Sequence, residues 1–145
     1  MGLKYNQLGN LEPGIYEMDW DEFKDEFGFN EHRRWLLEGA EIAIEDLRTV
    51  GCEAIYMDGS FITKKIEPKD YDLCWEDEGI NLVDVAKMCR PLIDLGWKKS
   101  KMLERYRGDV GPANNIADMD KGITFLGYFT EDKQGRDKGI IRIEI

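Results

Sequence analysis

The fold of this chain is decided by the segment Ala54-Ile55-Tyr56-Met57-Asp58-Gly59-Ser60 (residues 54–60). Its first four residues form a short apolar run, and the Asp-Gly-Ser that follows is typical of a turn. The segment therefore predicts a buried strand that ends in a turn. Residues 71–75 predict a second strand. Alternate side chains of a strand share a face, so this strand would present three residues on one side: Asp70, Asp72 and Cys74.

Helical patterns lie on either side of these two strands. Residues 31–50 carry one apolar stripe at three- and four-residue steps, which predicts an amphipathic helix of about five turns. A pattern like a capping box at Asp19 and Glu22 predicts a short helix before it. Residues 81–95 return to helical spacing, with Pro91 as a kink or an interruption.

The two ends of the chain and the stretch 97–122 read differently. Residues 1–18 predict an extended arm with a turn, and within 97–122 the segments 97–99 and 103–106 are interpreted as edge strands. Residues 123–129 and 139–145 are strand-like runs separated by a polar loop that contains glycine. This arrangement predicts a C-terminal β-hairpin.

The order of these elements predicts the fold class. Helix, strand, turn, strand, helix, strand and hairpin follow one another, which favours an α+β fold: a mixed β-sheet with helices packed mainly on one face. With 145 residues, 42% of them hydrophobic and 11% aromatic, the chain can build one real core. We expect a single domain over residues 1–145.

Charge restricts the partners of this domain. The 30 acidic residues outnumber the 20 basic ones, and the net charge is −10. Proteins that bind duplex nucleic acid regardless of its sequence use an excess of Lys and Arg, so this class is disfavoured. A local pocket for one nucleotide and a basic protein partner both remain open.

The cysteines and the hydropathy of the sequence indicate where in the cell the protein would be found. Cys52, Cys74 and Cys89 are widely spaced and form no CxxC pair, and the first residues do not resemble a signal peptide. These features predict reduced thiols in a cytoplasmic protein. Zinc is disfavoured because His32 is the only histidine. No apolar run approaches the ~20 residues of a membrane span, so we expect no membrane association.

Two neighbouring features carry chemistry. Asp70 and Asp72 would project from one strand face, and two close carboxylates repel unless a cation lies between them. Mg²⁺ suits such a pair because it prefers oxygen ligands and leaves positions for substrate phosphates. Gly59 and Ser60 complement the pair, because small residues after a buried strand let phosphate oxygens approach backbone N–H groups. We therefore expect a metal and phosphate site here.

These motifs resemble those of a known superfamily. The segments Met57-Asp58-Gly59-Ser60-Phe61-Ile62-Thr63 and Asp70-Tyr71-Asp72-Leu73-Cys74-Trp75 are similar to the Gly-Ser…Asp-x-Asp signature of the DNA polymerase β-type nucleotidyltransferases. Further similarity is to the small nucleotidyltransferase-like proteins of bacteria and phages, through Asp58 to Lys64, Pro68 to Asp72 and Lys138 to Ile143. The resemblance spans most of residues 12–145 and implies a nucleotidyltransferase-like fold.

The resemblance also implies roles for individual residues. Asp70 and Asp72 would hold Mg²⁺ or Mn²⁺, and Gly59-Ser60 would contact the triphosphate of an NTP. A third carboxylate on a later strand would complete the site, with Asp109 as the first candidate and Glu104 as the second. Lys64 is a candidate phosphate-binding residue, although lysines in a polar loop are usually just solvated. Asp58 is interpreted as a turn residue that points away from the metal face.

Two functions follow from this interpretation. The first is an enzyme, a Mg²⁺-dependent nucleotidyltransferase that moves NMP from an NTP to an acceptor, which the acidic composition suggests is a protein or a small molecule. The second is a catalytically degenerate module on the same fold, acting as a phage-type inhibitor of a host or defence protein or as an antitoxin-like partner. The choice depends on whether a third carboxylate joins the first two.

Overall fold

The computed structural model describes residues 3–7, 9–93, 100–114, 116–118, 123–124 and 138–145. Over these residues the chain forms four α-helices, two 3-10 turns and two β-sheets. In chain order the elements are β1 (Ile15–Met18), α1 (Trp20–Phe27), α2 (Glu31–Thr49), β2 (Ala54–Asp58), η1 (Gly59–Ile62), β3 (Asp72–Trp75), α3 (Leu82–Met88), η2 (Arg90–Ile93), α4 (Ser100–Tyr106), β4 (Asp109–Pro112), β5 (Ile116–Asp118), β6 (Ile123–Thr124) and β7 (Ile140–Glu144).

The main sheet is mixed and has five strands in the order β1-β7-β2-β3-β4. β7 is parallel to β1 and antiparallel to β2, while β3 is antiparallel to β2 and parallel to β4. β5 and β6 form a separate two-stranded antiparallel sheet. The predicted α+β class with a mixed sheet is confirmed.

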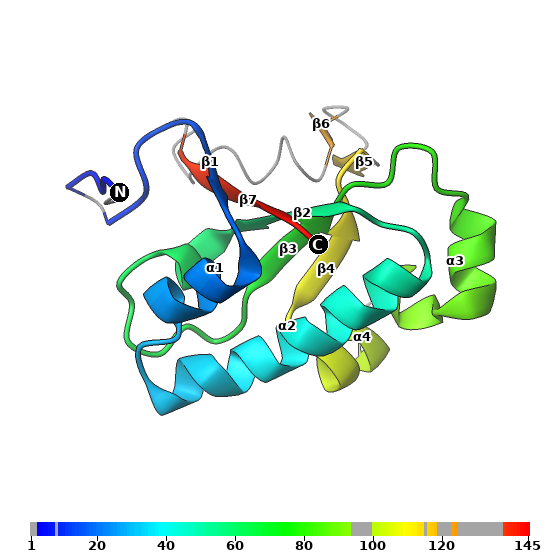
Figure 1. Cartoon of the computed structure of the whole chain (residues 1–145), viewed down its shortest axis with the longest axis horizontal. Helices are drawn as coiled ribbons and strands as arrows, with labels where there is room; N and C mark the ends of the chain where they lie inside the picture. Colours follow the sequence, from blue (N-terminus) through cyan, green and yellow to red (C-terminus); the bar gives the residue numbers. More distant parts are fainter. Residues whose placement is uncertain (1–2, 8, 94–99, 115, 119–122, 125–137) are drawn as a thin grey trace.

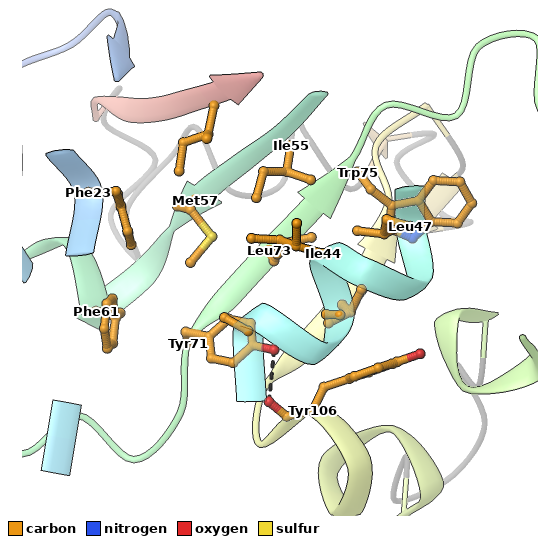
Figure 2. Packing of buried hydrophobic residues seen from close by; sticks show 14 of the residues in the cluster. Phe23, Ile44, Leu47, Ile55, Met57, Phe61, Tyr71, Leu73, Trp75 and Tyr106 are labelled. Atoms are coloured by element: carbon orange, nitrogen blue, oxygen red, sulfur yellow. Dashed lines mark hydrogen bonds between the residues drawn. The ribbon is translucent and has the colours of Figure 1, made fainter. Parts of the chain in front are cut away.

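The core lies between this sheet and helix α2. In Figure 1, α1, α2 and α4 lie on the same side of the sheet. Figure 2 shows Ile55, Met57 and Leu73 of the strands facing Ile44 and Leu47 of α2, and all five side chains are buried. Burying apolar area of this kind is the main stabilising contribution to folding. None of the described helices is both long enough and apolar enough to cross a membrane.

The predicted helices before the first core strand are confirmed. α1 begins with a capping box in which Asp19 accepts from the N–H of Glu22, as its sequence pattern predicted. α2 begins after Asn30, whose side chain accepts from the N–H of Arg33. Each of these bonds satisfies a backbone donor that the first turn of a helix leaves unpaired.

Proline interrupts the next helical segment. The helix predicted over 81–95 is interrupted within its described part, residues 81–93, because α3 ends at Met88 and Pro91 lies inside the 3-10 turn η2. A proline inside a helix removes one hydrogen bond and collides with the preceding turn.

Three sequence expectations need correction or lie partly outside the description. Residues 103–106 belong to helix α4 and not to an edge strand. The end of the N-terminal arm is a sheet strand, since β1 pairs with β7. The predicted C-terminal β-hairpin is not confirmed: its last strand is present as β7, but β7 pairs with β1 and β2, while β6 pairs with β5. The expected segments 97–99 and 125–129 lie outside the described residues.

Candidate functional site

Three aspartates lie side by side on the sheet face that is turned away from the helices. Asp58 of β2 is the register partner of Asp72 of β3, and Asp72 is the register partner of Asp109 of β4. Adjacent strands lie about 4.8 Å apart, so the three residues form a row across the sheet. Their neighbours in the strands are buried in the core on the opposite face: Met57, Leu73 and Val110.

Asp72, at the centre of this row, has surroundings that disfavour the negative charge of its carboxylate. Burial raises the pKa of Asp72, and the negative charges of Asp70, Asp109 and Asp58 raise it further, to about 7. The positive charge of Lys138 acts in the opposite direction. A carboxyl group in this setting gains from any cation that binds beside it, because the cation removes the repulsion.

Gly59 packs directly against Asp72. Its φ is +78°, a left-handed conformation that side chains disfavour, and a Cβ atom at this position would collide with Oδ2 of Asp72. The backbone therefore approaches the carboxylate as only glycine allows. The predicted proximity of the Gly-Ser turn and the acidic strand is present in the structure.

Ser60 follows in the 3-10 turn η1, where its carbonyl oxygen accepts from the Thr63 hydroxyl at 2.6 Å. η1 is four residues long. A single turn of this kind lacks the aligned peptide dipoles that a longer helix directs at an anion. Any attraction for phosphate at Ser60 has to come from individual backbone N–H groups and the hydroxyl.

Asp58 belongs to the carboxylate row, so its interpretation as a turn residue directed away from this face was wrong. The physical reason is the register: Asp58 and Asp72 are partners across an antiparallel pair and so share a face. Asp58 is buried and its Oδ1 lies 3.4 Å from Nζ of Lys138. Burial raises the pKa of Asp58 to about 6, against the opposing effects of Lys138 and the Gly59 N–H.

The remaining predicted site residues have different placements. Asp70 lies two residues before Asp72, just outside β3, and its charge acts on Asp72. Asp109 is the strand carboxylate beside Asp72, whereas Glu104 is exposed on helix α4. Lys64 is exposed, with its Nζ 5.5 Å from the ring centre of Tyr5. Of the two candidates for the third carboxylate, the structure brings Asp109 to the row.

The carboxylates in and beside the row are ligands of the kind that a hard divalent cation binds. Carboxylate oxygens are the ligands that Mg²⁺ prefers, and Asp70, Asp72 and Asp109 supply several of them in one region. Within the described part of the chain, however, no three His, Cys, Asp or Glu side chains converge tightly enough to form a metal-binding group as they stand. The residue types therefore suit a metal ion, but a coordination site would require these side chains to rearrange.

Arg33 is a positioning residue that the sequence interpretation missed. Its guanidinium is buried and donates five hydrogen bonds to four carbonyl oxygens, those of Phe27, Phe61, Thr63 and Lys65. Three of these carbonyls belong to the loop that follows Gly59. Burial lowers the pKa of Arg33 to about 10, which leaves the group charged at neutral pH. Arg33 therefore fixes this loop to helix α2.

A signal for Arg33 was present in the sequence. The apolar stripe of α2 includes Leu36, Leu37 and Ala40, and counting back by three or four residues from these positions leads to Arg33. A charged residue on the buried face of a helix needs several hydrogen-bond partners. The partners could not be assigned, because they lie about 30 residues later in the chain.

Comparison with known proteins adds family membership to this geometry. Neither the curated proteins nor the solved structures contain a match to the chain. Residues 3–144 match the model of a family described as a family of unknown function, DUF6932. Because that match covers nearly the whole sequence, the chain belongs to the DUF6932 family.

Proposed function

We propose that this protein is a Mg²⁺-dependent nucleotidyltransferase that transfers NMP from an NTP to an acceptor, on a nucleotidyltransferase-like fold. The single observation that carries the proposal is the register pairing of Asp72 with Asp109, with the Gly59 backbone packed against Asp72. This pairing places the two halves of the sequence motif and a third-carboxylate candidate in one region of one sheet face.

In this proposal Asp72 and Asp109, with Asp70 beside them, hold the metal. When bound, Mg²⁺ neutralises charge on the phosphates and supports in-line displacement at phosphorus. Asp72 is suited to its role because burial, and then the negative charges of its neighbours, raise its pKa, and a cation beside it would favour the ionised carboxylate. Gly59 lets the backbone of the turn pack against the Asp72 carboxylate, where any side chain would collide with it.

The loop after Gly59 supplies the phosphate contacts. Backbone N–H groups and the Ser60 hydroxyl are donors of the right kind for phosphate oxygens. Arg33 holds three carbonyl oxygens of this loop, so the loop keeps its shape without help from a ligand. A preformed loop binds a phosphate with less loss of conformational entropy than a mobile one.

A catalytically degenerate binding module is the second candidate, and Lys138 favours it. Nζ of Lys138 pairs with Asp58 and also acts electrostatically on Asp72, so the row already has a cation of its own. Because Lys138 already offsets part of the negative charge of the row, a bound metal ion would stabilise the row less. The net charge of −10 would then suit a basic protein surface as partner.

Turnover separates the two candidates. The wild-type protein is incubated with Mg²⁺ and each of the four NTPs, and pyrophosphate release and NMP incorporation into protein or small acceptors are measured. We expect turnover in wild type and at least about a hundredfold loss in Asp72→Asn and Asp109→Asn, because metal stabilisation of the transition state is worth several kcal/mol. The exposed Asp25→Asn variant is the matched control and should keep its activity.

The enzyme proposal fails if wild type neither binds nor turns over any NTP under these conditions. NTP binding without turnover, with binding lost in Asp72→Asn, supports the degenerate module. Equal turnover in wild type, Asp72→Asn and Asp109→Asn would assign the activity to another site and overturn the proposed one.

A further inference from the structure

A cavity of about 360 Å³ lies between the N-terminal arm, the end of α1 and the loop that follows η1. Its walls include Tyr5, Phe27, Phe29, Thr63, Lys64 and Ile66. The volume is in the range of small-molecule sites, and aromatic walls with a few polar groups are typical of such sites. The cavity is distinct from the carboxylate row.

Arg33 contacts three of the residues that line this cavity. It donates to the carbonyls of Phe27 and Thr63, which both line the cavity, and its guanidinium carbon lies 4.2 Å from the ring centre of Phe29. The positive charge of the guanidinium therefore lies over the Phe29 ring, in a cation–π contact. On the arm side, Tyr5 is bridged to Leu11, and the Leu11 carbonyl accepts from the N–H of Gly139, so the arm is tied to the start of β7. Hydrogen bonds therefore hold in place the segments that surround the cavity.

Apolar surface remains open at its mouth. Phe29 is 45% exposed and Ile66 is 67% exposed, although both residues line the cavity. Glu26, Thr63 and Lys64 add acceptor and donor groups of both charges to the same walls. A neutral, flat ring that carries both donors and acceptors matches this mixture better than an anion or an aliphatic chain.

The cavity is also close to the proposed phosphate loop. Thr63 lies four residues after Gly59, and at the 3-10 rise of about 2 Å per residue this separation is roughly 8 Å along the segment. A ribose and one phosphate can bridge such a distance.

We infer that this cavity binds the base of the NTP whose phosphates lie at Gly59-Ser60, with Tyr5 and Phe29 providing aromatic contact. The inference rests on the proposed function and adds a second part to that site. Contact with aromatic rings tolerates different bases, because every base has a flat π face. The cavity therefore binds a nucleoside through its ring and shows modest preference among the four NTPs.

Calorimetric titration tests the inference with two probes. Mg·NTP carries a base, and Mg·tripolyphosphate does not. Wild type should bind NTP more tightly than tripolyphosphate. Phe29→Leu, which keeps the apolar bulk and removes the aromatic ring, should weaken NTP binding about tenfold and leave tripolyphosphate binding unchanged. Val83→Ala, at an exposed apolar position on α3, is the matched control and should change neither.

Two results would overturn the inference while the proposed function stands. The first is tripolyphosphate binding as tight as NTP binding in wild type. The second is NTP binding that is unchanged in both Phe29→Leu and Tyr5→Leu. If wild type binds neither triphosphate, the proposed function fails and adenosine alone becomes the probe. Shifts of the Phe29 and Ile66 NMR signals on adding adenosine then support the cavity as a base site, and their absence overturns it.

Discussion

Asp72 and Asp109 are register partners on adjacent parallel strands, with their side chains on the sheet face that is turned away from the helices. They lie 37 positions apart in the chain, and the register of β3 and β4 alone brings them together. Each residue is followed in its strand by a buried apolar residue, Leu73 or Val110. A shift of one position would expose these two side chains, so the core fixes the carboxylates in place.

Gly59 gives the first prediction. Gly59→Ala places a methyl group against the Asp72 carboxylate and forces a left-handed backbone on alanine. Gly79 has the same φ of +78° with nothing near its Cβ position, so Gly79→Ala measures the backbone cost alone, about 1–2 kcal/mol. We expect Gly59→Ala to lose roughly 1–3 kcal/mol more in urea unfolding. Equal losses in the two variants would mean that Gly59 does not pack on Asp72.

Arg33 gives the second prediction. Arg33→Met removes all five hydrogen bonds to loop and helix carbonyls, and the carbonyls left inside lack partners. The expected loss of stability is about 3–5 kcal/mol in urea unfolding. The neighbouring Arg34 is exposed and donates to one carbonyl, so Arg34→Met should cost less than about 1 kcal/mol. Similar losses for Arg33 and Arg34 would contradict the positioning role.

Lys138 and Asp58 form a partly enclosed ion pair, with side chains 17% and 3% exposed, and give the third prediction. Lys138→Met leaves a buried carboxyl group without its cation and should lower stability by roughly 2–4 kcal/mol at pH 8. Adding Asp58→Asn removes the stranded charge and should restore part of that stability. The double-mutant cycle in urea unfolding measures the coupling. Strictly additive losses would show that the pair contributes nothing.

Asp46 gives a prediction about pH. Arg105 donates to both oxygens of its carboxylate, at 2.7 and 3.1 Å, and the Tyr106 hydroxyl donates at 2.8 Å. Burial raises the pKa of Asp46, but these hydrogen bonds outweigh burial and hold it below its usual value of 3.8. The folded protein therefore binds this proton less readily than the unfolded chain.

It follows that the contribution of Asp46 to stability is complete above pH ~4 and is lost as the pH falls through the lower folded-state pKa. Because Arg105 is half exposed, the contribution is about 1 kcal/mol. Urea unfolding between pH 2 and 6 should show a smaller acid-dependent loss in Asp46→Asn than in wild type. Identical pH profiles for the two proteins would refute this assignment.

The sequence predicted those helices and strands whose pattern lies within the element itself. The stripe of α2, the box at Asp19 and the run that forms β2 are short-range features, and each one formed where expected. The segment 103–106 was misread because its apolar residues are too few to separate a helix from a strand. Its helix is stabilised by tertiary contacts, with Met102 and Tyr106 fully buried. Tertiary packing overrides weak local preference.

The candidate site was predictable in part for the same reason. Asp72 and Gly59 lie in one motif, so their proximity followed from the sequence, whereas the face of Asp58 depends on how β2 pairs with β3. The same holds for Arg33, whose carbonyl partners come from a different segment. The helical stripe could have indicated that Arg33 is buried, although that inference was not made, and only the folded chain identifies what Arg33 binds.

Binding of Mn²⁺ tests the central claim most directly. Free Mn²⁺ is followed by electron paramagnetic resonance in titrations of wild type, Asp72→Asn, Asp109→Asn and the exposed Asp25→Asn, each with and without NTP. We predict that NTP tightens Mn²⁺ binding to wild type and Asp25→Asn, and that binding is at least about tenfold weaker in both Asp72→Asn and Asp109→Asn. Equal Mn²⁺ binding by all four proteins would contradict a metal site at the paired carboxylates.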